Sequence, residues 1–146
     1  MRYNLDCSAG SAYFSFATGG AVVVNDPMNS TAWDFKVDGW DIKLNSAIHG
    51  PGQAAVSPGG TDFDAVTDAP NAPQAYMTDG LTSIFGTATE HPWFRYSDQH
   101  ELITKNHVYL LKFPDNRIFK LQIENYYKIV SGSPQSGWVQ FRFREI

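Results

Sequence analysis

The last third of the sequence restricts the fold more than any other part, because three of its segments alternate apolar and polar residues. The segments are HVYLLKF (107–113), RIFKLQIENYY (117–127) and GWVQFRFRE (137–145). Alternation with a period of two is typical of β-strands that bury one face, and short polar linkers between such strands favour antiparallel pairing. The sequence therefore predicts an antiparallel three-stranded meander, with PDN and KIVSGSPQS as its connections.

The same alternation assigns a face to each residue of the last two strands. The buried face is expected to hold Phe119, Leu121, Ile123, Val139, Phe141 and Phe143. The other face carries a basic stripe of Lys120, Gln122, Gln140, Arg142 and Arg144. We interpret this stripe as a solvated strand face, and an anion-binding surface is the alternative.

A second β signal is the segment WDFKVDGWDIKLN (33–45), in which a Trp-Asp pair occurs twice around Asp38-Gly39. Asp-Gly is favoured in two-residue type I′ turns, so the segment predicts a β-hairpin with its turn at these residues. In that register the apolar face holds Trp33, Phe35, Val37, Trp40, Ile42 and Leu44. The polar face would then pair Lys36 with Asp41 and Asp34 with Lys43.

The rest of the chain adds short strands and many turns. Residues 12–16 and 21–24 predict an opening hairpin, and a further short strand is expected at 53–56. The segment TDFDAV predicts one helical turn with Thr61 as its N-cap, and 74–92 is expected to be a long loop or a weak hairpin. With 14% aromatic residues, 12 glycines and 8 prolines, we predict an all-β, sandwich-like antiparallel fold made of hairpins, in one domain over residues 1–146.

Composition excludes several function classes. The formal net charge of −4 argues against a nucleic-acid binder, which needs a surplus of basic residues to neutralise phosphate. No apolar run is long enough for a transmembrane helix, and the start of the sequence lacks a signal-like pattern. The single cysteine, Cys7, cannot form an intramolecular disulfide, so cysteine usage does not indicate the compartment. No motif of a hydrolase, zinc protease, nucleotide-binding loop or dinucleotide fold is present, so we expect no enzymatic activity.

Histidines are the residues best suited to bind a ligand, because imidazole is the commonest metal ligand in proteins. His91 and His100 bracket the aromatic segment PWFRYSDQ, where two imidazoles could approach a flat apolar ligand. Asp98 and Glu101 flank His100 and could orient its ring. We interpret His107 as a strand-end residue and His49 as a solvated turn residue.

The order of these segments resembles the HmuY-like haemophore family over most of the chain. The resemblance is carried by WDFKVDGWDIKLNS, PWFRYSDQHEL, VYLLKFPDNRIFKLQIENYY and the closing WVQFRF, in that order. Its most specific parts are the Trp-Asp hairpin ending in Lys43-Leu44-Asn45 and a set of strand residues: Tyr109, Lys120, Leu121, Ile123 and Tyr126. The resemblance implies an all-β protein, extracellular or associated with the outer membrane, that binds haem for iron acquisition without enzymatic activity.

The resemblance also implies a ligand set. His100 lies near the position of the second axial ligand of the family, and the other ligand would come from His91 or Met77. Trp93, Tyr76 and Phe85 would contact the porphyrin. The expected partner is haem or a related tetrapyrrole.

A different class of function is also consistent with the sequence. A cofactor-free structural, adhesion or self-assembling β module could use the same scaffold to bind another protein or a second copy of itself. Visible absorbance after addition of haem separates the two hypotheses, because only the haem carrier would give a Soret band.

Overall fold

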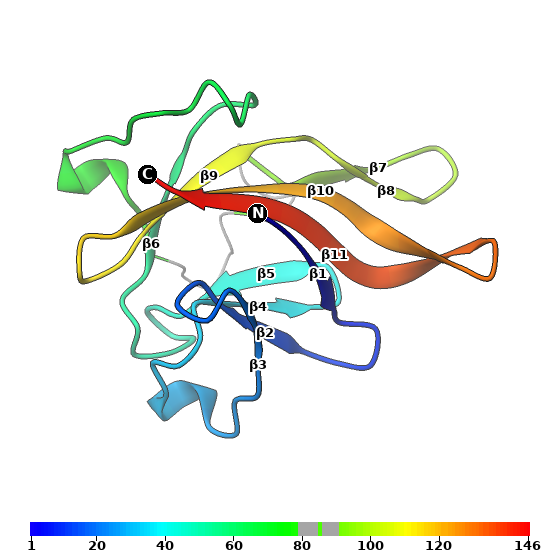
Figure 1. Cartoon of the computed structure of the whole chain (residues 1–146), viewed down its shortest axis with the longest axis horizontal. Helices are drawn as coiled ribbons and strands as arrows, with labels where there is room; N and C mark the ends of the chain where they lie inside the picture. The colour runs from blue at the N-terminus through cyan, green and yellow to red at the C-terminus, as the bar shows by residue number, and fades with distance from the viewer. Residues whose placement is uncertain (79–84, 86–90) are drawn as a thin grey trace.

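The computed structural model of the chain describes residues 1–78, 85 and 91–146. Its regular structure is almost entirely β-strand (Figure 1), and the described residues contain no α-helix, only the 3₁₀ turns η1 (Pro27–Asn29) and η2 (Pro73–Ala75). The all-β fold predicted from the sequence is confirmed. The segment 74–92, predicted as a long loop or weak hairpin, lies in large part outside the described residues.

The larger sheet has five antiparallel strands in the order β1-β11-β10-β9-β6. The strands are β1 (Arg2–Asp6), β6 (Ala55–Pro58), β9 (Val108–Lys112), β10 (Ile118–Val130) and β11 (Ser133–Glu145). The predicted meander is therefore confirmed as β9, β10 and β11. The strand expected at 53–56 is β6, which begins two residues later than predicted.

The hairpin of β10 and β11 is longer than its sequence suggests. The predicted linker KIVSGSPQS is part of the ladder, and the chain reverses at Ser131 and Gly132, where φ is 52° and 79°. Two successive residues with positive φ are typical of a type I′ turn, whose twist matches that of the flanking strands. The ladder register shifts twice around Asn125, and the end of the hairpin extends beyond the rest of the molecule (Figure 1).

The smaller sheet has four antiparallel strands in the order β3-β2-β4-β5. The strands are β2 (Ala12–Ser15), β3 (Gly20–Val22), β4 (Phe35–Asp38) and β5 (Asp41–Leu44). Both hairpins predicted for this part of the chain are present. Figure 1 shows this sheet below the five-stranded sheet, in agreement with the predicted sandwich-like arrangement.

The turn of the β4–β5 hairpin lies one residue further along than predicted. The two loop residues are Gly39 and Trp40, and only Gly39 has a positive φ, 63°, as in a type II′ turn. The predicted face is correct for Phe35, Val37, Ile42 and Leu44, which are buried, but Trp40 is 48% exposed at the tip. Trp33 is buried as well, against Tyr13, at a ring-centroid distance of 5.1 Å.

The charge pairs predicted for this hairpin are wrong, because the shifted register places like charges opposite each other. Lys36 pairs with Lys43 across the strands. Asp38 compensates for both, since its Oδ2 lies 3.3 Å from Lys36 Nζ and 3.6 Å from Lys43 Nζ. The Asp38 carboxylate, close to both ammonium groups, offsets the electrostatic repulsion between Lys36 and Lys43 on this partly exposed face.

The core lies between the two sheets and is built mainly from phenylalanine rings. Phe14 of β2 is fully buried and links the layers. Its ring centroid lies 5.2 Å from that of Phe35 in its own sheet, and 4.9 and 5.4 Å from those of Phe141 and Phe143 on β11. Aromatic rings in edge-to-face contact add to the stability that burial of their apolar area provides. The predicted buried face of β10 and β11 is therefore confirmed.

Residues 61–66, which we call the strap, cross the outer face of β10 and β11. The helical turn predicted here is wrong: this segment is an irregular turn in which Asp62 Oδ1, not Thr61, accepts the amides of Asp64 (3.1 Å) and Ala65 (3.3 Å). An Asp side chain that bonds to amides two and three residues later stabilises such a turn without a helix.

The strap buries part of the predicted basic stripe. Lys120 is only 4% exposed, and its Nζ donates to the carbonyl oxygens of Phe63 (2.5 Å) and Val66 (2.9 Å). The ring of Phe63 lies between two cations, with Lys120 Nζ 4.3 Å and Arg142 Cζ 4.4 Å from its centroid. The interpretation as a solvated face was therefore wrong for Lys120. The strap that covers it is distant in the sequence, and the alternation of apolar and polar residues in β10 does not predict that another segment lies on this face.

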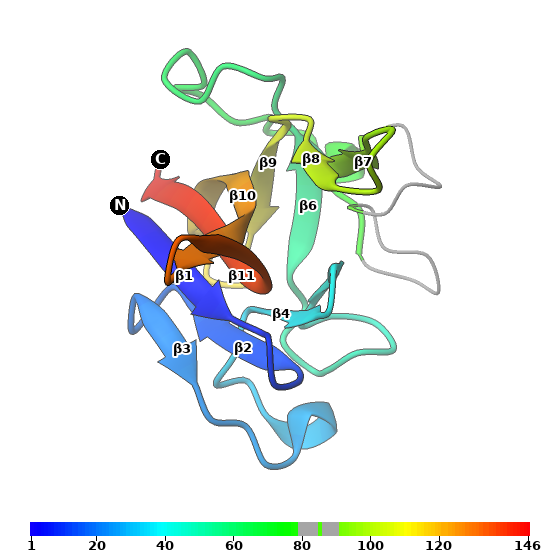
Figure 2. The ribbon, with the colours of Figure 1, turned by 90° about the vertical axis from the view of Figure 1, so that its right-hand side faces the viewer.

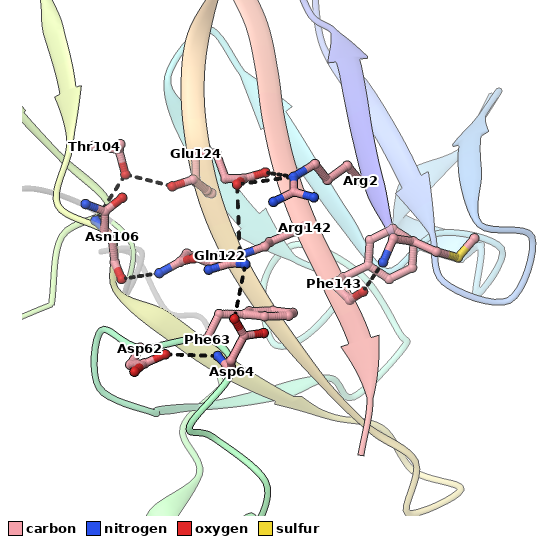
Figure 3. Close-up of polar contacts among 12 residues, drawn as sticks. Arg2, Asp62, Phe63, Asp64, Thr104, Asn106, Gln122, Glu124, Arg142 and Phe143 are labelled. Atoms are coloured by element: carbon pink, nitrogen blue, oxygen red, sulfur yellow. Dashed lines mark hydrogen bonds and ion pairs between the residues drawn. The ribbon is translucent and has the colours of Figure 1, made fainter.

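Gln122 is also buried under this segment. Its Nε2 donates to the carbonyl oxygens of Thr61 (3.1 Å) and Asn106 (2.7 Å), and its Oε1 accepts from Arg142 Nε at 2.9 Å. Figure 3 shows Gln122 between Arg142 and Asn106, with Phe63 on the strap beside Arg142. These contacts satisfy the buried amide and attach the strap to the sheet.

Candidate functional site

Two histidines meet beside a small separate hairpin. The hairpin is formed by β7 (Phe94–Tyr96) and β8 (Leu102–Thr104), and it lies on the opposite side of the molecule from the two chain ends (Figure 2). His91 precedes β7 and His107 follows β8, and their ring centroids lie 5.4 Å apart with the ring planes at 89°. The register explains this contact, because Phe94 pairs with Thr104, and continuing the same ladder outward places residue 91 opposite residue 107.

The backbone around this pair is attached to the core. The hydroxyl of Tyr109, a fully buried residue of β9, donates to the carbonyl oxygen of His91 at 2.5 Å. The amide of Lys105 donates to the carbonyl oxygen of Trp93 at 2.9 Å, which continues the β7–β8 ladder toward the histidines. The positions of both imidazoles therefore depend on core strands and not on the surface loop alone.

The environment of His107 favours its neutral form. Partial burial lowers the pKa of His107 below its usual value of 6.5, and the nearby charges of His91 and Lys105 lower it further. Burial also raises the pKa of Tyr109 far above its usual range, so that its hydroxyl keeps the proton it donates to His91. A neutral imidazole has a free nitrogen lone pair, which is the form that binds a metal ion.

The structure places His100 away from this pair. His100 lies in the loop that connects β7 to β8, at the other end of the hairpin, and its side chain is exposed. Its φ is 60°, and its amide donates to the carbonyl oxygen of Ser97 at 3.0 Å. The structure thus brings His91 together with His107 and not with His100.

The predicted porphyrin contacts fall in two environments. Trp93 and Phe85 are core residues, 2% and 0% exposed; Trp93 Nε1 donates to the carbonyl oxygen of Trp40, and Phe85 packs on Tyr109 at a ring-centroid distance of 4.5 Å. Both side chains are therefore part of the core and leave almost no surface for direct contact with a porphyrin.

Tyr76 and Met77 lie beside the edge strand β6. The main chain of Met77 pairs with Val56, and its side chain is 52% exposed. The hydroxyl of Tyr76 donates to the carbonyl oxygen of Pro70 at 2.9 Å, and Lys112 Nζ lies 5.2 Å from its ring centroid. Tyr76 lines a cavity of about 240 Å³, and no histidine contributes to the lining of that cavity.

His107 is the residue that sequence reasoning did not select. The signal that could have found it is symmetry: His91 and His107 are equally distant from the centre of the hairpin formed by residues 94–104. The chemistry of the pair fits ligation of haem iron, which takes one or two axial ligands from His and Met side chains. Within the described residues, no group of three or more His, Cys, Asp or Glu side chains could hold a metal ion by itself.

Comparison with known proteins gives a consistent result. A family model described as HmuY protein matches residues 9–90, which is more than half of the chain. No curated protein matches the sequence.

Three solved structures share the fold. An apo HmuY analogue of Tannerella forsythia has a TM-score of 0.67 at 14% identity, with 99% of this chain and 94% of that chain covered. A candidate HmuY-like haem-binding protein of Bacteroides vulgatus has a TM-score of 0.66 at 20% identity, with 97% and 89% covered. A candidate lipoprotein of Bacteroides fragilis has a TM-score of 0.64 at 15% identity, with 97% and 86% covered.

Proposed function

The chain belongs to the HmuY family, a haem-binding family, and from this premise we propose that it is a non-enzymatic haem carrier for iron acquisition. The observation that supports a site is the contact between His91 and His107, whose ring centroids lie 5.4 Å apart. We propose these two side chains as the candidate iron ligands, in preference to the pairing of His100 with His91 or Met77 that the sequence suggested.

The residues around the pair would support such a ligand. Because burial keeps His107 neutral, its imidazole can offer a lone pair at neutral pH. Phe85 and Trp93 are core residues, and Phe85 packs on Tyr109, whose hydroxyl donates to the carbonyl oxygen of His91. The exposed Lys105 ammonium is a cation available to a haem carboxylate. When bound, haem would supply an iron centre, which imidazole nitrogens such as those of His91 and His107 can ligate.

We further propose that the protein acts outside the cytoplasm, associated with the outer membrane. The support for this location is the family and the similarity to the Bacteroides fragilis protein described as a candidate lipoprotein. In the part of the chain that the structure describes, no helix has the length and hydropathy needed to cross a bilayer.

Titration with ferric haem tests the function and the ligands together. The wild-type protein should give a sharpened Soret band that saturates at one haem per chain. His91→Ala and His107→Ala should each weaken binding at least about tenfold, as expected when one of two axial ligands is lost. His100→Ala is the matched control and should bind like wild type.

Other outcomes assign the site or the function differently. If His100→Ala weakens binding and His107→Ala does not, the pairing of His100 with His91 or Met77 suggested by the sequence is correct. If wild type shows only the broad absorbance of free haem, the haem-carrier function is wrong. Dimer formation without a Soret band would then favour the self-assembling module.

A further inference from the structure

A large cavity lies on the side of the molecule that carries the two chain ends, away from the paired histidines (Figure 2). It has a volume of about 700 Å³ and lies between the strap, the β2–β3 turn and the ends of β1 and β11. Much of its lining consists of arginines and phenylalanines: Arg2, Arg142, Arg144, Phe63, Phe119 and Phe143. The acidic residues Asp64 and Glu145 also line it, and the Glu145 carboxylate accepts from Arg117 at 2.9 Å. A volume of this size matches sites for small organic ligands and exceeds what a single inorganic ion fills.

The pairing of β1, β10 and β11 brings four cationic side chains close together on the outer face of the larger sheet. Arg2 pairs with Arg142 across β1 and β11, and Lys120 pairs with Arg144 across β10 and β11. Like charges directly opposite each other in a sheet are destabilising. Two such pairs in adjacent rows form a positive surface on a chain whose formal net charge is −4. Sheet stability alone does not explain this arrangement.

Local carboxylates compensate only part of this charge. Glu124 accepts from Arg2 Nε at 3.0 Å and lies 3.9 Å from Arg142, and Asp64 of the strap lies 4.0 Å from Arg142 (Figure 3). The Lys120 ammonium is satisfied by the two strap carbonyls. The side chain of Arg144 makes no ion pair or hydrogen bond with another described residue, is exposed, and lines the cavity.

The lining therefore combines the unpaired Arg144 side chain with the exposed edges of phenylalanine rings that are otherwise buried. A guanidinium binds carboxylate oxygens in a planar, two-point geometry, and phenylalanine rings favour an apolar body. We propose that this cavity binds an amphipathic anion, a small apolar molecule with one carboxylate, held by Arg144 and packed against Phe63 and Phe143. The site shares no residue with the histidine pair and does not depend on haem binding.

Calorimetric titration of the purified protein with decanoate, and with decan-1-ol as the neutral probe of equal chain length, tests the proposal. Decanoate should bind wild type saturably, and Arg144→Gln should raise its dissociation constant about tenfold, the loss expected for one charge-assisted contact. The weaker binding of decan-1-ol should be unchanged by Arg144→Gln. Arg95→Gln removes an exposed arginine outside the cavity and should leave both constants unchanged.

A second variant tests the volume instead of the charge. Ala17 is exposed at the cavity wall, so Ala17→Trp should fill the space and abolish binding of both probes while every arginine remains. The proposal is overturned if wild type does not bind decanoate saturably, or if Arg144→Gln and Ala17→Trp bind it like wild type. Displacement of decanoate by one equivalent of ferric haem would overturn the separation of the two sites and assign haem to this cavity.

Discussion

Asn45 is a buried polar residue that connects three segments of backbone. It is 1% exposed, and its Nδ2 donates to the carbonyl oxygens of Trp33 (2.8 Å) and Ser30 (3.0 Å). Its Oδ1 accepts from the amide of Gly52 at 2.9 Å. A Cβ atom on Gly52 would lie 2.7 Å from Asn45 Cγ, so the glycine is needed for this close approach. One amide thus stabilises the loops on both sides of the β4–β5 hairpin.

Replacing Asn45 by alanine should destabilise the protein by about 2–4 kcal/mol, because buried backbone groups lose their partners. Urea unfolding followed by circular dichroism measures the change in the free energy of unfolding. Asn4→Ala, at an exposed position of β1, is the matched control and should stay within about 0.5 kcal/mol of wild type. Equal stability of the two variants would mean that water replaces the Asn45 amide at no cost.

His107 should make stability depend on pH in a defined direction. Its pKa in the folded protein lies below the usual 6.5, so between these two values the unfolded chain binds more protons. The contribution of His107 is therefore complete above pH 6.5 and is lost as the pH falls toward the folded-state value. Urea unfolding from pH 5 to 8 should show this loss in wild type and a smaller one in His107→Gln. An identical pH profile for the two proteins would contradict the burial of this imidazole.

At the scale of strands and turns, the alternation of apolar and polar residues determines which face of the sheet a side chain lies on. It does not determine which residues pair across two strands. Moving the β4–β5 pairing by two residues leaves Phe35, Val37, Ile42 and Leu44 on the buried face, so both registers fit the pattern equally well. The turn backbone decides between them: a type I′ turn at Asp38-Gly39 needs positive φ at both residues, whereas the observed turn at Gly39-Trp40 needs it only at Gly39. The sequence was thus sufficient for the hairpin and its core residues, and insufficient for its charge pairs.

Two glycines with positive φ allow the cost of backbone strain to be measured separately from the cost of a steric clash. Gly39 has φ 63° and open space around it, whereas Gly137 has φ 88°, and an added Cβ would lie 2.8 Å from Ser8 Cα. Gly39→Ala should cost about 1–2 kcal/mol, the penalty of a left-handed L-residue. Gly137→Ala should cost a further ~1–3 kcal/mol, because β1 and β11 must separate locally. Thermal unfolding of both variants measures the difference, and equal melting temperatures would show that the backbone at Ser8 moves freely.

At the scale of the molecule, the two sheets should unfold together, because Phe14 contacts both. Phe14→Ala should destabilise by about 3–5 kcal/mol, as expected for a large cavity in a packed core. Tryptophan fluorescence and far-ultraviolet circular dichroism should report one shared transition in wild type. Val23→Ala is the control, since Val23 is 92% exposed and should change stability by less than about 0.5 kcal/mol. Separate transitions by the two probes would show that the sheets are independent.

The all-β class, the meander and the buried phenylalanines were predictable because each depends on local periodicity. The burial of Lys120 and the contact of His91 with His107 were not, since both result from segments that meet only in the folded chain. The strap reaches Lys120 across more than fifty residues of sequence. His107 looked like an ordinary strand end until the β7–β8 register placed it opposite His91. Site residues are therefore the part of such a fold that periodicity describes least well.

The pairing of β1 with β11 makes the order of synthesis matter. Arg2 pairs with Arg142 in the ladder, so β1 has no partner in the sheet until β11 has been synthesised. Contacts of such long sequence separation form slowly, because the intervening chain must be ordered first. The five-stranded sheet is therefore expected to assemble later than the β2–β3 and β4–β5 hairpins, whose strands are neighbours in the sequence.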